Sequence, residues 1–240
     1  MKLISVRFLK KSFHKAGKTD RCWRLKKCVL TVEGETEQWY FIWLRDQING
    51  FEGRTYNVSI VPKVQQSPMS FYKGTNSKVT PEVIHICDVE STDDYHIEKF
   101  ENILKEMKEA DRQKKIKYQL GYSNFTFELW MILHKKDCFG PFNSRKQYLA
   151  PIQQAFGEKF ENLDHYKQES AFKRCLGKLS LNDVKDALRR ADKIAEQNVK
   201  DRKKPVNLCG YSYYRDNPAL SINEVVKKIF TECGVLPKRK

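Results

Sequence analysis

Four short runs of apolar residues, separated by segments with helical periodicity, set the pattern of the first half of the chain. The runs predict buried strands at residues 28–32, 56–61, 83–88 and 116–122. Helices are predicted between them at Glu37–Gln47, from Ser91 to about Asp111, and from about Phe125 to His134. Alternation of strand and helix is typical of a mostly parallel sheet covered by helices, so the predicted fold class is α/β and Rossmann-like.

The second half of the chain has a different pattern, which is helical throughout from Ser144 onward. Capping boxes are predicted at Ser180 and Ser221, each three residues before an acid, and Gly234 fits the stop of the last helix. Residues 63–80 are rich in Ser, Gln, Gly, Thr and Pro, which predicts a long loop. We therefore expect helical C-terminal elements packed on the α/β core.

Charge adds a third part to this organisation. The chain carries 45 Lys or Arg against 30 Asp or Glu, a net charge of +15, and the excess lies in residues 1–27 and 171–204. We divide the chain into a basic N-terminal arm at 1–27, a core at 28–143 and helical elements at 144–240. Clustered cations favour a phosphate backbone, although a solvated arm explains the first stretch equally well. The predicted nucleic-acid contacts are Lys10, Lys11, Arg21, Arg24, Lys26, Lys27, Arg189, Arg190, Lys203 and Lys204.

Several classes of protein are not supported by the sequence. No segment approaches the ~20 apolar residues that a membrane-spanning helix needs, and Met1–Lys11 lacks the apolar stretch of a secretory signal. The seven cysteines are scattered without C-x-x-C spacing, which argues against a zinc ribbon and for reduced, mostly buried thiols. No Walker A pattern is present, so any ATP dependence would come from a partner. We expect a cytoplasmic protein with no membrane partner.

Acidic residues follow two of the predicted strands and interrupt an apolar helix. Glu33 and Glu37 flank the turn after the first strand, Asp88 and Glu90 follow the third, and Glu128 lies within the apolar run from Phe125. Neighbouring strands lie ~4.8 Å apart, close enough for Glu33 and Asp88 to share one cation. Crowded carboxylates repel one another unless a divalent cation neutralises them, and Mg²⁺ or Mn²⁺ suits hard oxygen ligands.

Each of these residues also has a simpler explanation. Glu37 lies in the first turn of a helix, where acids offset the helix dipole. Asp88 can simply end a strand, and Glu128 can accept hydrogen bonds at the start of its own helix. His134 ends that helix, where a histidine commonly caps the last carbonyls. These alternatives stay open at the level of sequence.

Four segments together resemble RloB-like proteins. Val29–Phe41 (VLTVEGETEQWYF) is similar to their E-G-x-x-T/E-x-x-Y-F opening, and Val83–Glu90 to their strand ending in Asp-x-Asp. Asn124–His134 (NFTFELWMILH) resembles the N-P-x-F-E-L-W-hydrophobic-H segment, which is the most specific match. Asn217–Val226 is similar to the C-terminal N-P-hydrophobic helix. The fold of these proteins resembles the Toprim domain of topoisomerases, primases and OLD-family nucleases.

The resemblance implies roles by position. Glu33 would be the general acid/base or a metal ligand, and Asp88 and Glu90 would bind Mg²⁺. Glu37 would contribute as in the OLD-type E-G-x-x-E pattern. Glu128 and His134 match the family's own signature.

The sequence departs from the family pattern in two places. Glu90 replaces the second Asp, and Phe125 replaces the Pro of the N-P-x-F-E-L-W segment. RloB-like proteins are associated with bacterial restriction and abortive-infection loci, often beside an ATPase. The resemblance therefore implies a metal-dependent nuclease that acts as an antiphage effector, with nucleic acid and an ATPase subunit as partners.

Two other functions remain consistent with the residues. The first is a non-catalytic nucleic-acid-binding or assembly subunit, which the Glu90 departure favours. The second is a phosphatase in which Asp88-x-Glu90-x-Thr92 is a variant of the D-x-D-x-T motif, with Asp88 as the nucleophile. That motif normally ends the first strand of its fold, whereas Asp88 ends the third predicted strand. The phosphatase hypothesis also gives no role to Glu33.

Overall fold

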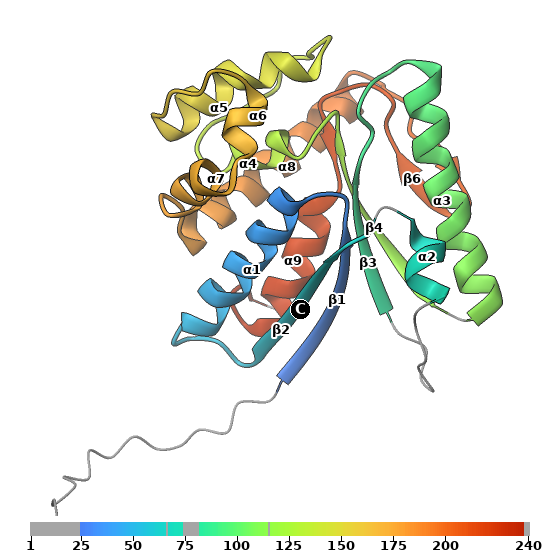
Figure 1. Cartoon of the computed structure of the whole chain (residues 1–240), viewed down its shortest axis with the longest axis horizontal. Helices are drawn as coiled ribbons and strands as arrows, with labels where there is room; N and C mark the ends of the chain where they lie inside the picture. The colour runs from blue at the N-terminus through green and yellow to red at the C-terminus, as the bar shows by residue number, and fades with distance from the viewer. Residues whose placement is uncertain (1–24, 66, 74–81, 115, 238–240) are drawn as a thin grey trace, which may run out of the picture.

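The computed structural model describes residues 25–65, 67–73, 82–114 and 116–237 of the 240-residue chain. Its centre is a sheet of five strands in the order β2-β1-β3-β4-β7, of which the first four are parallel and β7 is antiparallel to β4 (Figure 1). The strands are β1 Leu25–Val32, β2 Asn57–Val64, β3 Glu82–Asp88, β4 Lys117–Asn124 and β7 Ala219–Leu220. The predicted α/β class with a mostly parallel sheet is confirmed.

Helices cover both faces of this sheet. The helices α1 (Glu35–Gly50) and α9 (Ile222–Cys233) pack on one face, and α3 (Asp94–Lys114) and the short α2 (Pro68–Lys73) pack on the other (Figure 1). Because β3 is central, its side chains are buried on both faces: Ile84 and Ile86 join the core below α1, whereas Val83 and Cys87 join the core below α3.

The strand order creates a switch point between β1 and β3. The chain leaves β1 through α1 to reach β2 on one side, and leaves β2 through α2 to reach β3 on the other side of β1. In open α/β sheets, ligands bind beyond the carboxyl ends of the strands at such a point. Glu33 follows β1 directly and Asp88 is the last residue of β3, so both lie there.

A group of helices extends from the carboxyl edge of the sheet on the side of α1 (Figure 1). These elements are α4 Glu128–Leu133, the 3-10 helix η1 Arg145–Tyr148, α5 Leu149–Phe156, α6 Leu163–Lys167, α7 Glu169–Leu176 and α8 Leu181–Lys200. The predicted helical C-terminal elements are thus present. The prediction of helix throughout was wrong, however, because β5 (Val206–Leu208) and β6 (Tyr211–Tyr213) form a hairpin and β7 joins the sheet.

The predicted helix ends agree with the structure in part. Ser180 and Asp183 form the expected capping box of α8, and Gly234 ends α9 with φ +79°. Ser221 precedes α9 but does not cap it, because its hydroxyl accepts from Tyr122 N and donates to Leu120 O of β4. The predicted loop at 63–80 contains α2, and its residues 66 and 74–80 lie outside the described residues.

The start of α3 also differs from the sequence prediction. The helix was predicted to start at Ser91, but it begins at Asp94. The Asp93 carboxylate accepts a hydrogen bond from His96 N at 3.0 Å, so Asp93 is the capping side chain.

Candidate active site

A hydrogen bond joins the ends of the two central strands. Asp88 N donates to Glu33 Oε2 at 3.0 Å, which holds the carboxylate of Glu33 against the end of β3. The Asp88 carboxylate in turn accepts from Phe127 N at 3.2 Å through Oδ2. Because these contacts use backbone donors, the two carboxylates are positioned by the strand ends themselves. The predicted proximity of Glu33 and Asp88 is confirmed.

Gly34 makes room for a second glutamate beside this pair. Glu37 is buried in the first turn of α1, where Thr36 Oγ1 donates to Glu37 Oε2 at 3.1 Å. A Cβ atom at position 34 would lie 2.9 Å from Glu37 Oε2, closer than such contacts allow. Gly34 has φ −141°, so space for the carboxylate, rather than backbone freedom, favours glycine here.

Glu128 brings a fourth carboxylate from α4. It is 1% exposed, and its Oε2 accepts a hydrogen bond from Thr126 Oγ1. Glu128 Oε1 is buried and has no hydrogen-bond partner, but Lys167 Nζ lies 3.3 Å away. Lys167 ends α6, and sequence analysis did not identify it because nothing in its local sequence distinguishes it from other helical lysines.

Burial and mutual repulsion raise the pKa values of the clustered acids. Loss of solvent, together with repulsion from Glu37, raises the pKa of Glu33 to about 7 against the opposing effect of the Asp88 N–H bond. The pKa of Glu37 is raised by burial and by repulsion from Glu128, and that of Asp88 lies well above its ordinary value for the same kind of reason. Burial disfavours the Lys167 ammonium, yet the neighbouring carboxylates keep its pKa above the ordinary value.

Glu90 points to different partners. The chain does not stay extended after Asp88, because Glu90 adopts φ +69°. Val89 N still donates to Ser123 O of β4, and Glu90 N donates to Phe125 O. Glu90 Oε1 accepts from Lys99 Nζ at 2.6 Å, and Oε2 lies 3.2 Å from His96 Nε2 and 3.7 Å from Arg145 Nη1. These cations hold the pKa of Glu90 below its ordinary value, against partial burial, which acts to raise it. Glu90 therefore forms an ion-pair cluster beside the site.

A pocket of about 260 Å³ opens over the acids. Its lining includes Glu33, Glu37 and Asp88 on one side and Lys99, Arg145 and Lys167 on the other, besides Glu90. Among the residues that the structure describes, no three acidic, histidine or cysteine side chains converge into a ready-made metal site. The cluster has the donor atoms for a hard cation, but in this arrangement the charge opposite the acids comes from lysine and arginine.

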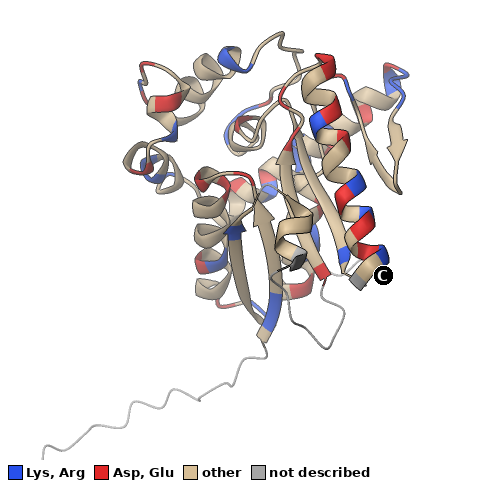
Figure 2. Cartoon of the chain, turned by 45° about the vertical axis from the view of Figure 1, so that its right-hand side comes forward, with Lys and Arg blue, Asp and Glu red and all other residues tan. Residues whose placement is uncertain are grey.

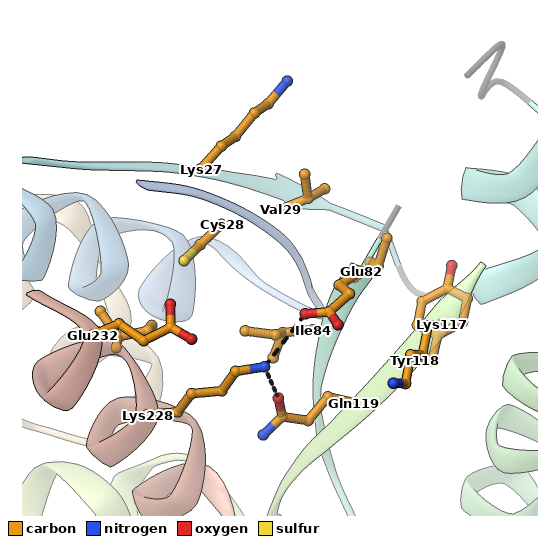
Figure 3. Close-up of a pocket in the computed structure, with 12 residues that line it drawn as sticks. Lys27, Cys28, Val29, Glu82, Ile84, Lys117, Tyr118, Gln119, Lys228 and Glu232 are labelled. Atoms are coloured by element: carbon orange, nitrogen blue, oxygen red, sulfur yellow. Dashed lines mark hydrogen bonds and ion pairs between the residues drawn. The ribbon is translucent and has the colours of Figure 1, made fainter. Parts of the chain in front are cut away.

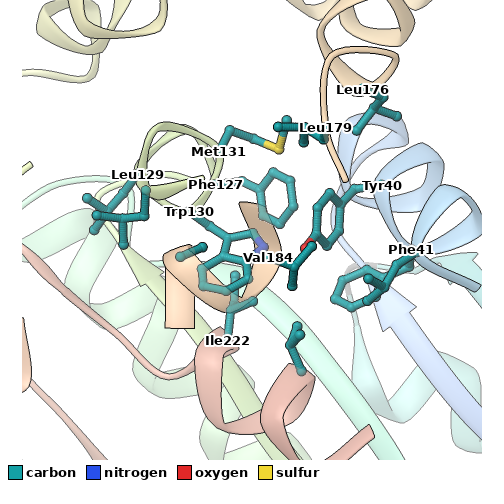
Figure 4. Packing of buried hydrophobic residues seen from close by; sticks show 14 of the residues in the cluster. Tyr40, Phe41, Phe127, Leu129, Trp130, Met131, Leu176, Leu179, Val184 and Ile222 are labelled. Carbon is teal, nitrogen blue, oxygen red and sulfur yellow. The ribbon is translucent and has the colours of Figure 1, made fainter. Parts of the chain in front are cut away.

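His134 lies in the core rather than in the pocket, so the predicted catalytic role is not supported. Its Nδ1 lies 2.9 Å from the Trp130 carbonyl and its Nε2 lies 3.1 Å from the Tyr40 hydroxyl. A carbonyl can only accept, so Nδ1 carries the proton and Nε2 accepts from Tyr40. Burial lowers the pKa of His134 to about 4, which keeps the ring neutral. Figure 4 shows Tyr40 and Trp130 packed with Phe127 in this core.

Comparison with known proteins assigns the chain to a family. The family model described as RloB-like protein matches residues 28–229, which is most of the chain. The chain belongs to the RloB-like family. No curated protein and no solved structure gave a match. Among the described helices of this RloB-like protein, none is long and apolar enough to cross a membrane.

The predicted basic contacts near the start of β1 lie at the opposite end of the sheet from the acids. Lys26 and Lys27 precede Glu33 by seven and six residues of extended chain, respectively, about 20 Å. Figure 2 shows basic residues at the start of β1 and acidic residues at the start of α1. Lys26 lies 3.8 Å from Glu232, and its ammonium lies over the ring of Tyr56. Lys10, Lys11, Arg21 and Arg24 lie outside the described residues.

A small pocket of about 160 Å³ marks that opposite end of the sheet (Figure 3). Lys228 donates there to Glu82 at 3.5 Å and Gln119 at 3.3 Å, so its charge is balanced. Lys27 also lines the pocket, and its side chain points away from Lys228.

The remaining predicted contacts are partly structural. Arg190 Nη1 donates to the carbonyls of Leu133 and His134, which satisfies the end of α4 and fixes this guanidinium. Arg189 is exposed and pairs with Asp186, and Lys203 Nζ donates to the Asn217 carbonyl at 3.4 Å. Lys204 is exposed. Their role in binding nucleic acid stays a prediction.

Proposed function

We propose that this RloB-like protein is a nuclease that hydrolyses phosphodiester bonds in DNA or RNA with the help of Mg²⁺ or Mn²⁺. The observation that carries the proposal is the gathering of Glu33, Glu37, Asp88 and Glu128 around the switch point of the sheet. Such a concentration of poorly solvated carboxylates destabilises a fold and is retained mainly at functional sites. The resemblance to the Toprim fold supports the same chemistry.

The chemistry of the donor set fits a hard divalent cation. Glu33, Glu37 and Asp88 supply oxygen ligands, and burial and mutual repulsion raise their pKa values. Glu128 Oε1 adds a buried oxygen without a hydrogen-bond partner. A bound Mg²⁺ or Mn²⁺ would supply charge neutralisation and a water molecule of lowered pKa.

Side chains of the protein would supply the general base, the charge balance for the phosphate and the positioning of the ligands. Glu33 exchanges its proton near neutral pH, because its pKa is about 7, and it is the candidate general base. Lys167 and Arg145 line the same pocket and would balance the charge of a phosphate. Gly34 and Thr36 hold Glu37 in place from the start of α1.

The test is cleavage of plasmid, single-stranded DNA and single-stranded RNA with Mg²⁺, with Mn²⁺ and with a chelator. The expected result is metal-dependent cleavage by the wild-type protein that falls at least about 100-fold in Glu33→Gln. Glu52→Gln is the control, because Glu52 is exposed just beyond the end of α1 and lines neither the acidic pocket nor the cavities beside it. Cleavage that persists in Glu33→Gln or in the chelator would contradict the proposal.

A second function is favoured by a specific observation. The Lys167 ammonium already faces the buried acids, and Glu90 is bound by three basic side chains. In a subunit that binds nucleic acid without cutting it, these lysine and arginine side chains would stay paired with the acids and no metal would replace them. Its signature is nucleic-acid binding that is unchanged in Glu33→Gln, with no cleavage by either protein.

The place of this activity follows from the resemblance alone. As an RloB-like protein, the chain would act in the bacterial cytoplasm as the effector of an antiphage system, with an ATPase as its partner. Co-expression with the adjacent ATPase, followed by co-purification and phage challenge, tests this. Protection that requires both Glu33 and the ATPase is expected. Protection by the ATPase alone would exclude the effector role.

A further inference from the structure

Two larger cavities adjoin the acidic pocket, one on each side. The first is about 680 Å³ and shares Glu90, Arg145 and Lys167 with the acidic pocket. The second is about 450 Å³ and shares Glu33 and Lys99 with it. The three cavities share lining residues in turn: the first is lined by residues of η1 to α6 and the second by residues of α3, with the acidic pocket linking them. We call them together the carboxyl-edge groove.

Basic side chains line the groove on the side of η1. Arg145 is about half exposed, and it shares its closest acid, Glu90 at 3.7 Å, with Lys99. Lys146 is exposed and has no ion pair among the described residues. Within the described part of the chain, Lys146 therefore presents an unpaired positive charge to the groove, and Arg145 adds a half-exposed guanidinium that is only partly balanced by Glu90.

An exposed aromatic side chain lies beside the acidic pocket. Tyr95 is 73% exposed in the first turn of α3, and it lines the cavity that also contains Glu33 and Lys99. Its ring meets His96 edge to face, with the centroids 5.2 Å apart, and His96 lines the first cavity. Tyr95 belongs to neither hydrophobic core, so its ring face is available to a ligand.

We infer that the carboxyl-edge groove binds a single nucleic-acid strand, with phosphates along Arg145 and Lys146 and a base stacked on Tyr95. The inference deepens the proposed function by naming its substrate class. In a duplex the base faces are covered by their neighbours, whereas an unpaired base can stack on an exposed ring. The acidic pocket shares lining residues with both cavities, so a strand that fills the groove lies next to the acids.

Equilibrium binding in a chelator tests the groove without depending on cleavage. Fluorescence anisotropy of a labelled 15-nucleotide single strand, and of the same sequence as a duplex, is measured with the full chain and its variants. The wild-type protein should bind the single strand more tightly than the duplex. Tyr95→Ala should weaken single-strand binding about 5- to 100-fold, whereas Tyr95→Phe, which keeps the aromatic ring, should bind with the wild-type affinity. Phe139→Ala is the control, since Phe139 is 40% exposed but lines none of the three cavities.

The phosphate contacts have a separate readout. Lys146→Ala should weaken binding and reduce the slope of log affinity against log salt by ~0.7, the value for one single-strand phosphate. Lys117→Ala, an exposed lysine at the opposite edge of the sheet, should leave the slope unchanged.

Equal affinity for duplex, or wild-type binding that Tyr95→Ala leaves intact, would overturn the inference. If single-strand binding follows the prediction but no cleavage occurs with Mg²⁺ or Mn²⁺, the inference of a single-strand binding groove is supported and the proposed nuclease activity is contradicted.

Discussion

The ammonium of Lys167 lies 3.3 Å from Glu128 Oε1, and Lys167 also lines the pocket that contains Glu33, Glu37 and Asp88. Lys167 comes from α6, on the far side of the pocket from the strands that carry the acids. The side chain supplies the positive charge that the buried carboxylates need. A divalent cation entering the pocket would meet this ammonium, so the two positive charges repel each other.

Lys167→Met is therefore expected to change metal affinity and stability in opposite directions. Loss of the ammonium removes a repulsive charge a few ångströms away, which should increase Mn²⁺ affinity at least about tenfold. It also leaves Glu128 without its partner, which should lower the stability of the metal-free protein by about 1–3 kcal/mol. Calorimetric titration and thermal unfolding, each with and without Mn²⁺, measure both effects.

A matched variant and a double variant complete that experiment. Lys173→Met removes an exposed lysine that pairs with Glu169 on α7, and it should change neither quantity measurably. Lys167→Met combined with Glu128→Gln should recover most of the lost stability, because no uncompensated carboxylate remains. Weaker Mn²⁺ binding in Lys167→Met would mean that the lysine assists the metal site instead of opposing it.

The position of Glu33 and Asp88 could be predicted from sequence because it depends on local pattern alone. Each follows a recognisable apolar strand, and the carboxyl ends of parallel strands share one edge of a sheet. The α/β class followed from the same alternation. Ser180 could be placed because a capping box is a contact within four consecutive residues.

The errors arose where long-range contacts decide the outcome. Glu90 turns away at a backbone φ of +69°, with its N–H bonded to Phe125 O and its carboxylate to Lys99 of α3. Lys167 reaches the acids only through the packing of α6, and the two residues of β7 are too few for any periodicity. Ser221 matches the capping pattern, yet its hydroxyl bonds to β4. His134 matches the histidine of the family's F-E-L-W segment, but its ring is buried and bonded to Trp130 and Tyr40 in the core.

The pKa of Glu33 predicts a pH-dependent stability difference between wild type and Glu33→Gln. The folded-state pKa is about 7, above the ordinary value of 4.5, so the folded protein holds this proton more tightly than the unfolded chain does. Stability from this group is then complete below about pH 4.5 and is lost as pH rises toward 7. Glu33→Gln should gain up to about 3 kcal/mol relative to wild type over that interval.

The quantity to compare is the difference in unfolding free energy between wild type and Glu33→Gln at each pH, because two buried histidines change stability with pH in the opposite direction. Burial lowers the pKa values of His85 and His134 to about 4, so their contribution to stability is lost as pH falls from 6.5 toward 4. Both proteins contain these histidines, and subtraction removes their effect. Urea unfolding at half-unit intervals from pH 4 to 8, in a chelator, gives the curve. A flat difference would show that Glu33 is not perturbed.

Gly34→Ala tests whether the space beside Glu37 matters to the site. The added methyl group would lie 2.9 Å from Glu37 Oε2, so the carboxylate must move. We expect Mn²⁺ affinity to fall about tenfold, with a stability change below about 1 kcal/mol. Gly50→Ala at the end of α1 is the control, because nothing lies within 4 Å of its added atom. If the two variants bind Mn²⁺ equally, Glu37 is not a ligand.

The central claim is that the acids at the ends of β1 and β3 form a divalent-metal site. Its most direct test is calorimetric titration of wild type and Asp88→Asn with Mg²⁺ and Mn²⁺, since asparagine keeps the size of the side chain and an oxygen for Phe127 N. The account predicts saturable binding by wild type and affinity at least about tenfold weaker in a folded Asp88→Asn. A folded wild-type protein that binds neither ion, or a variant that binds as tightly as wild type, would contradict it.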